Sequence, residues 1–364
     1  MRDCIIIGGG VMGCLVGLRL RQAGAQVSIL ERAVPGAEAS SAAAGILSPQ
    51  AEAHHLGDAL GLALASRELY PALAAELLEL TGVDIGYRRS GVLQVALDEV
   101  GQLALGETAA RQRALGLAVE ALDGVAAREL EPGLAPTVRA ALRFPRDGQL
   151  EPRALTRALA IAARRAGCEI LTGRLVHRVR SEAGAVAAVV TDEGELPCAR
   201  VVVAAGSWSG LIGGLEDVGI DTTTVRPARG QLCELDARTP PLGHVVFGPG
   251  GYLVPRPDGR VICGSTLEFV GFDKAVTAGG LAAVLHSALA LAPGLATAPV
   301  TATWSGLRPW SAGGRLLCGP TTIAGLALAT GHFRNGILLA PISAELVADH
   351  VLGRPPRHVP PSPH

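Results

Sequence analysis

The sequence lacks the patterns that nucleic-acid and metal sites need. Aromatic residues make up 3% of the 364 residues, the formal net charge is −1, and the 32 basic residues, all arginine except Lys274, are scattered along the chain. The chain therefore offers neither a basic footprint nor stacking platforms for nucleic acid. Its histidines include no His-x-x-x-His pair, which argues against a helical histidine metal site.

Cysteine is sparse, and its pattern suggests no pairing. The seven cysteines are scattered singly, with no C-x-x-C spacing and no histidine at zinc spacing. An odd, isolated set is typical of reduced core residues, so we expect a cytoplasmic protein without a metal site. The set comprises Cys4, Cys14, Cys168, Cys198, Cys233, Cys263 and Cys318.

No apolar run predicts a membrane span. Residues 275–307 contain no Asp, Glu, Lys or Arg, but glycines and prolines interrupt them. Their sustained helical piece, residues 280–291, is too short to cross a bilayer. The apolar start of the chain is predicted to be a buried strand and not a signal peptide, because no small-residue cleavage site follows it.

What the chain does contain is a nucleotide-binding pattern near its start. Residues 5–7 form an apolar run typical of a buried strand. Gly8, Gly10 and Gly13 follow as G-x-G-x-x-G, before a helix expected at residues 11–23. In this pattern the first glycine permits a tight turn, the second lets the backbone approach a pyrophosphate, and the third lets helix and strand pack closely. The helix N-terminus then faces the phosphates.

The pattern continues into a second strand that ends in an acid. Gly24 is expected to stop the helix, and residues 27–30 are a second apolar run that leads into Glu31. An acid about 20 residues beyond the glycines is placed to bond ribose hydroxyls. Its carboxylate would repel a ribose phosphate, which disfavours NADP and leaves FAD or NAD.

Small residues recur where an extended dinucleotide would pass. Residues 35–50, PGAEASSAAAGILSPQ, combine serines with alanines and glycines, which suits a backbone laid along a phosphate or a flat ring. A second small-residue turn follows the apolar run at residues 201–203. Within it, GSWSG carries Trp208 where a nucleophile elbow would carry serine, which argues against a serine hydrolase.

The remaining pattern predicts a nucleotide domain that opens and closes the chain around a mostly antiparallel insertion. Strands are expected to dominate residues 225–307. Helices are expected at residues 57–81, 102–115, 280–291 and 336–352, with another ending at Gly167, and strands at residues 85–97 (an antiparallel pair), 169–180 (two strands) and 201–203.

A family resemblance runs through essentially the whole chain. In order, its stretches are GGGVMG with Glu31, SSAAAGIL, VVVAAGSWSG, RPARGQ, YLVPRPDGRVICGSTLE, WSGLRPW and GHFRNGILLAP. They resemble the FAD-dependent D-amino-acid oxidase superfamily, and within it the glycine-oxidase branch of thiamine biosynthesis. SSAAAGIL and GHFRNGILLAP are the most specific stretches, and they imply FAD instead of NAD.

The resemblance implies an α/β fold of two domains. An FAD-binding, Rossmann-like domain of the glutathione-reductase type would comprise residues 1–84, 146–222 and 309–364. An inserted, mainly antiparallel β-sheet domain that binds substrate would comprise residues 85–145 and 223–308. The resemblance also implies a homotetramer.

The resemblance further implies which residues contact FAD. Some would line the AMP half of FAD, some would follow the pyrophosphate and ring, and some would face the flavin pyrimidine edge. No covalent tether is expected, because the surroundings of Cys318 do not match the tethering motif of the sarcosine-oxidase branch. The cofactor residues are Gly8, Gly10, Val11, Met12, Gly13, Glu31, Arg32, Ala39, Ser40, Ala44, Gly45, Ile46, Val176, His332, Phe333, Arg334, Asn335, Gly336, Ile337 and Leu338.

For the substrate, the resemblance places Arg308 opposite a carboxylate, with Tyr252 and Arg334 assisting. It implies oxidative deamination of glycine, sarcosine or a small D-amino acid, with molecular oxygen reduced to peroxide. Two alternatives stay open, namely a dehydrogenase that passes electrons to a quinone or carrier, and a noncatalytic flavin-binding subunit.

Overall fold

A parallel sheet forms one half of the protein. The computed structural model describes residues 3–237 and 242–358. The strands of this sheet pair in parallel, except for the antiparallel edge pair β18–β19. In spatial order they are β18 (Leu317–Pro320), β19 (Leu326–Thr330), β12 (Val201–Val203), β1 (Cys4–Ile7), β2 (Val27–Glu31) and β8 (Glu169–Thr172).

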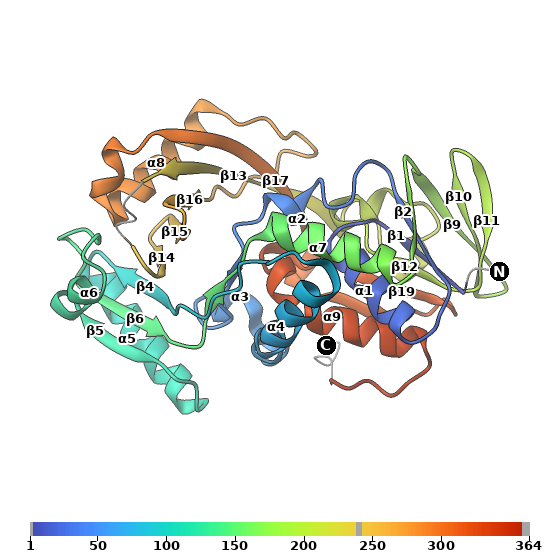
Figure 1. The fold of residues 1–364 in the computed structure, drawn as a ribbon, viewed down its shortest axis with the longest axis horizontal. Coiled ribbons are helices and arrows are strands. Elements are labelled where there is room, and N and C mark those ends of the chain that lie inside the picture. The colour runs from blue at the N-terminus through green and yellow to red at the C-terminus, as the bar shows by residue number, and fades with distance from the viewer. Residues whose placement is uncertain (1–2, 238–241, 359–364) are drawn as a thin grey trace.

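Both faces of this sheet are covered, which is why its strands are apolar on both sides. In β1, Cys4 and Ile6 pack into a helical core, whereas Ile5 and Ile7 pack into a second core on the opposite face. The helical side holds α1 (Val11–Gln22), α4 (Leu60–Thr81), α7 (Pro152–Arg165) and α9 (Gly336–Val351), which contact one another. The other side carries the antiparallel β9 (Val176–Glu182), β10 (Ala185–Thr191) and β11 (Gly194–Pro197) (Figure 1).

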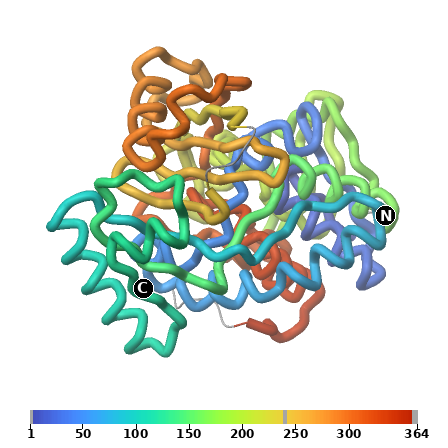
Figure 2. Tube along the Cα trace, turned by 60° about the vertical axis from the view of Figure 1, so that its left-hand side comes forward, coloured from blue at the N-terminus to red at the C-terminus, as the bar shows by residue number. Residues whose placement is uncertain are grey.

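The other half of the molecule is built on an eight-stranded sheet, most of which lies to the left of the first sheet in Figure 1; Figure 2 follows the same chain after a turn of 60°. Its pairs are antiparallel, except for the parallel β14–β4. In order it contains β17 (Val300–Ser311), β13 (Val225–Asp236), β16 (Arg260–Gly264), β15 (Gly251–Pro255), β14 (Val245–Gly248), β4 (Val92–Ala96), β6 (Ala140–Phe144) and β5 (Glu120–Asp123).

Helices and short elements complete this half and the junction. α8 (Ala278–Leu291) packs on β13, β15 and β16, and the Thr277 hydroxyl caps it by accepting a bond from the Gly280 N–H. The long strands β13 and β17 reach the 3₁₀ turn at Gly206–Leu211. The other elements are α2 (Ala39–Ala42), β3 (Ile46–Leu47), α3 (Ala53–Leu56), α5 (Glu99–Ala114), α6 (Gly124–Leu130), β7 (Gly148–Gln149), and 3₁₀ turns at Gly57–Ala59, Glu216–Val218, Pro293–Thr297, Ala312–Gly314 and Phe333–Asn335.

Most of the expected elements are confirmed, and one expectation was wrong. Residues 85–97 contain one strand, β4, and not an antiparallel pair, because its partners β14 and β6 come from distant parts of the chain. The helical stretch expected at residues 57–81 is confirmed, since a 3₁₀ turn at Gly57–Ala59 leads directly into α4, which ends at Thr81. The domain limits stay a prediction.

Within the described residues, no helix is long and apolar enough to cross a membrane, and no group of His, Cys, Asp and Glu could hold a metal ion.

Candidate active site

A cavity of about 420 Å³ runs from the strand ends of the parallel sheet to the eight-stranded sheet. Nearly all the residues expected to contact cofactor or substrate line it, although they come from seven separate segments of the chain. Gly13 and Leu338 are the exceptions, and both are buried. Lining residues from this set are Gly8, Gly10, Val11, Met12, Glu31, Arg32, Ala39, Ser40, Ala44, Gly45, Ile46, Val176, Tyr252, Arg308, His332, Phe333, Arg334, Asn335, Gly336 and Ile337.

The turn between β1 and α1 forms one end of the cavity. Gly8 has a φ of +106°, a conformation that side-chain-bearing residues rarely adopt. A Cβ on Gly13 would lie 1.9 Å from the Gly8 carbonyl oxygen, so only glycine lets α1 start this close to β1. First-turn amides of a helix have no intrahelical acceptor and attract anions, so this end suits a phosphate.

Side chains hold this turn in place. One Glu31 carboxylate oxygen accepts a bond from the Gly9 N–H at 2.8 Å, and the other accepts from the Ala33 N–H at 2.9 Å. The Ser40 hydroxyl accepts a bond from the Val11 N–H at 3.0 Å, which ties α2 to the start of α1. These contacts fix an acid and a helix N-terminus at the nucleotide end.

A cation–aromatic pair also lines this end. The Arg32 guanidinium lies 3.9 Å from the centre of the Trp208 ring and also pairs with Glu38 at 2.6 Å. In the sequence, Trp208 indicates only that GSWSG is not the nucleophile elbow of a serine hydrolase. Its place in the cavity depends on how the 3₁₀ turn after β12 folds, which local sequence does not reveal.

The middle of the cavity is shaped by small residues held from across the junction. Arg256, in the turn that follows β15, is 4% exposed, and it donates bonds to the Ala44 carbonyl at 2.7 Å and to the Leu150 carbonyl at 2.9 Å. Ala44 and Gly45 therefore present a flat wall without bulky side chains. The residues around Arg256 in the sequence give no signal of this role.

The N-terminal turn of α9 forms the opposite wall. The first-turn amides of this helix follow the 3₁₀ turn Phe333–Asn335, and Phe333 has a φ of +46°. His332 is 5% exposed, and its Nε2 lies 3.0 Å from the Ser343 hydroxyl. Burial lowers the pKa of His332 to about 3, so its imidazole is neutral at physiological pH.

We expect that the free energy of unfolding falls less with decreasing pH in His332→Gln than in the wild type. Between the unfolded pKa of about 6.5 and the folded pKa of about 3, the unfolded chain binds the extra proton. The contribution of His332 to the free energy of unfolding is therefore complete above the unfolded pKa and is lost as pH falls. Urea unfolding with saturating FAD near pH 7.5 and near pH 5 should show a smaller loss in the variant. An equal loss in both proteins would contradict a neutral, buried His332.

Arg308 extends from β17 into the end of the cavity that lies against the eight-stranded sheet. Its Nη2 donates to the Ser265 hydroxyl at 2.7 Å, and its Nη1 donates to the Thr266 carbonyl at 3.2 Å. Burial lowers the pKa of Arg308, an effect that neighbouring Tyr252 opposes. Among the described residues, no carboxylate forms an ion pair with Arg308, so its charge faces the cavity uncompensated.

Two glycines make room for the side chains at this end. A Cβ on Gly230 would lie 2.1 Å from Nη2 of Arg308, and a Cβ on Gly264 would lie 2.6 Å from the hydroxyl oxygen of Tyr252. The guanidinium and the phenol therefore occupy the space that these glycines leave free.

Arg334 is paired, in contrast to Arg308. Its Nε and Nη2 donate to the two carboxylate oxygens of Glu52, at 3.1 and 2.9 Å. Burial works to lower the pKa of Arg334, but Glu52 outweighs it and raises that pKa. Glu52 lines the cavity and was not identified from the sequence, because an isolated acid in AEAHH has no informative spacing.

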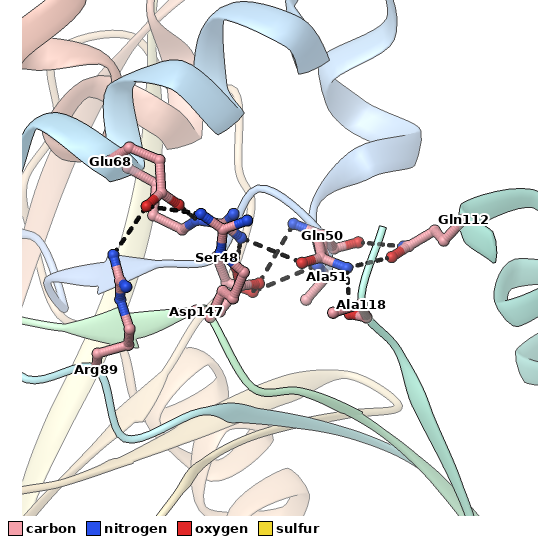
Figure 3. Close-up of polar contacts among 10 residues, drawn as sticks. Ser48, Gln50, Ala51, Glu68, Arg89, Gln112, Ala118 and Asp147 are labelled. Atoms are coloured by element: carbon pink, nitrogen blue, oxygen red, sulfur yellow. Dashed lines mark hydrogen bonds and ion pairs between the residues drawn. The ribbon is translucent and has the colours of Figure 1, made fainter. Parts of the chain in front are cut away.

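A buried polar network anchors the segment that carries Glu52 (Figure 3). Arg67 of α4 pairs with Asp147 at 2.6 Å, and Asp147 also accepts a bond from the Ser48 hydroxyl at 2.6 Å. Gln50 bonds Gln112 of α5 at 2.8 Å. The Glu52 N–H in turn donates to the Ser48 carbonyl at 3.2 Å. Paired and hydrogen-bonded buried charges of this kind hold one geometry, so Glu52 is fixed at the cavity edge.

Comparison with known proteins identifies the family. The family model for DAO, the FAD dependent oxidoreductases, matches residues 3–350. The chain belongs to this family. FAD is therefore its cofactor, as SSAAAGIL and GHFRNGILLAP implied.

Individual members of the family resemble the chain over nearly its whole length. Glycine oxidase from Geobacillus kaustophilus is 38% identical over 96% of this chain and 92% of that protein. Its crystal structure matches with a TM-score of 0.92 over 97% of this chain and 95% of that chain. The bifunctional protein ThiO/ThiG from Trichormus variabilis is 36% identical over 96% of this chain but 53% of its own length. Iminodiacetate oxidase (IdaA) from Chelativorans sp. BNC1 is 29% identical, with a TM-score of 0.87 over 98% of this chain and 97% of that chain.

Proposed function

We propose that this chain oxidises a small amino acid, namely glycine, sarcosine or a small D-amino acid, at its Cα. The imine product hydrolyses to a 2-oxo acid, and oxygen is reduced to peroxide. The observation that carries the proposal is the uncompensated Arg308 guanidinium at the end of the FAD cavity. Its planar fork can hold a carboxylate with two parallel bonds, which fixes the orientation of Cα. The similarity to glycine oxidases supports the same substrate class.

When bound, FAD would supply the redox chemistry, namely acceptance of a hydride from carbon and transfer of electrons to oxygen. The residues of the chain then have to orient the substrate and keep water away. Arg308 holds the carboxylate, the Tyr252 hydroxyl beside it supports the same end, and Arg334 assists from the opposite wall. No side-chain base is required, because a neutral substrate amine can drive the hydride from Cα once the substrate is oriented.

We further propose that the cofactor residues act as the family resemblance implies. Val11, Met12, Glu31 and Arg32 would line the AMP half, with Val176 meeting adenine through its main chain. The small residues from Ala39 to Ile46 would follow the pyrophosphate and the ring. The amides at the start of α9 would face the pyrimidine edge, where a positive helix end stabilises negative charge.

The cofactor should be held without a covalent bond. No cysteine lines the described part of the cavity, and Cys318 instead directs its thiol at the Ser343 carbonyl, 3.7 Å away. We expect acid or heat precipitation to release all flavin into the supernatant, measured by its absorbance. Flavin that precipitates with the polypeptide would contradict this arrangement.

Anaerobic mixing with amino acids tests the proposed function. Glycine, sarcosine and D-alanine should bleach the flavin absorbance, and admission of air should then restore it with oxygen uptake, peroxide and, from glycine, glyoxylate. Bleaching without oxygen consumption would identify a dehydrogenase that uses a quinone or carrier. If no amino acid reduces the flavin, a noncatalytic flavin-binding subunit is the alternative that remains.

The same proposal extends to the cellular role. The imine formed from glycine would supply thiamine biosynthesis, which the resemblance implies, and the fusion of similar sequences to a second unit in ThiO/ThiG proteins is consistent with such a transfer. We also propose a homotetramer in the cytoplasm. Light scattering during size-exclusion chromatography tests the assembly, since any other mass would contradict it.

A further inference from the structure

Three charged side chains define the substrate end of the cavity. These are Arg308, Arg334 and Glu52, which all line it, and both Arg334 and Glu52 lie close enough to act electrostatically on Arg308. The two guanidiniums and one carboxylate leave a single net positive charge at this end. A pocket with one net positive charge matches a ligand with one carboxylate.

Glu52 is responsible for that balance. Both of its oxygens are bonded to Arg334, and its side chain is 10% exposed, so solvent screens the pair poorly. The pair neutralises Arg334 and occupies one edge of its planar fork. A second carboxylate on the substrate would therefore meet a neutral pair, with a fixed carboxylate at its centre.

We propose that Glu52 is a specificity-determining residue that restricts this site to substrates with one carboxylate by neutralising Arg334. The inference rests on the proposed function and deepens it. Without the Glu52 charge, Arg308 and Arg334 would present two cations in one cavity, a pattern that suits N-substituted glycines with two carboxylates. The DAO-family scaffold is compatible with such chemistry, since iminodiacetate oxidase (IdaA) shares this fold.

The network around Ser48 and Asp147 is what makes this restriction effective. It fixes the backbone of residues 48–52 from two helices and the β6–β7 turn, and two bonds from Arg334 hold the carboxylate of Glu52 on this backbone. A mobile acid would move aside or exchange its partner, whereas an anchored one keeps its charge at the pocket.

The test compares two unreactive ligands on the FAD-loaded protein. Methoxyacetate carries one carboxylate and has the shape of sarcosine, whereas diglycolate carries two and has the shape of iminodiacetate. Titration of the flavin absorbance gives both dissociation constants. In Glu52→Gln, which keeps a hydrogen-bond acceptor without the charge, the preference for diglycolate over methoxyacetate should rise by about 10- to 100-fold, as expected for a new charge-assisted bond. The ratio of kcat/KM for iminodiacetate over sarcosine should rise with it.

Two further variants test whether the charge of Arg334 causes the changed preference. In the double variant Glu52→Gln with Arg334→Gln, the increased preference for diglycolate should vanish, because no second cation remains. Glu76→Gln is the matched control, since Glu76 forms a similar two-bond pair with Arg19, at 2.6 and 2.8 Å, but does not line the cavity. Its ligand preference should equal that of the wild type.

An unchanged preference in FAD-loaded Glu52→Gln would overturn the inference, as would a gain that survives in the double variant. If Glu52→Gln does not retain FAD, Arg334→Gln decides, because an unpaired Glu52 should weaken methoxyacetate binding by about 10-fold or more, and unchanged binding would overturn the inference. Because these ligands are not oxidised, the titrations remain valid even if no amino acid reduces the flavin.

Discussion

Arg308→Ala should lower kcat/KM for the amino-acid substrate by roughly 10- to 1000-fold or more, while FAD content stays near normal. A charge-assisted hydrogen bond contributes about 1.5 to 3 kcal/mol, and loss of one partner of a buried charge pair costs about 2 to 5 kcal/mol. Arg308 is suited to this role because its charge has no carboxylate partner in the described residues. Steady-state kinetics and the ratio of flavin to protein absorbance measure the two effects.

Arg308→Lys should restore little of this loss, since an ammonium keeps the charge but lacks the planar fork. Near wild-type kcat/KM in the alanine variant would show that the carboxylate binds elsewhere, with Arg334 as the next candidate. Loss of FAD in the same variant would instead place Arg308 in the cofactor site.

Gly230→Ala should lower kcat/KM by about 10- to 100-fold without removing any functional group. The new Cβ would lie 2.1 Å from Nη2 and 2.3 Å from Cζ of Arg308, so the guanidinium must move away from Ser265. The displaced group is the end of a flexible side chain and not backbone, so the cost falls on substrate binding instead of folding. KM should rise, with the midpoint of thermal unfolding and the FAD content nearly unchanged.

Gly279→Ala provides the matched control for this substitution. Gly279 lies in the first turn of α8, and a Cβ there would meet no atom within 4 Å. Its kcat/KM should equal that of the wild type. If Gly230→Ala also kept wild-type kinetics, the position of Arg308 would not govern substrate binding.

Much of the fold could be predicted because its signals are local. The apolar run before Gly8, the glycine spacing and the acid at Glu31 lie within one strand–helix–strand unit, and the structure confirms strand, turn and helix there. A helix such as α9 could be expected for the same reason, since its glycine start and apolar content are neighbours in sequence. The spacing of apolar residues indicates which face of a helix or strand is buried. This spacing depends only on residues that are neighbours in the sequence, so it can be recognised without the structure.

Which strands pair with one another could not be predicted from the sequence and is known only from the tertiary structure. β4 pairs in parallel with β14, more than a hundred residues later in the chain, and antiparallel with β6. Its alternating residues indicate a strand but not its partner, because every strand with one buried face offers the same backbone hydrogen bonds. This is why residues 85–97 were wrongly predicted to pair with each other.

The charged residues of the candidate site show most clearly what the sequence predicts and what only the tertiary structure decides. By itself the sequence predicted that a dinucleotide binds at the Gly8 turn, and its family resemblance singled out Arg308, Tyr252 and Arg334. Only the tertiary structure decided that Arg308 is left without a carboxylate partner in the described residues while Arg334 is paired with Glu52, 282 residues away. Chain connectivity does not specify which opposite charges meet, because an ion pair depends on a few ångströms of separation, and packing of the whole fold sets that distance.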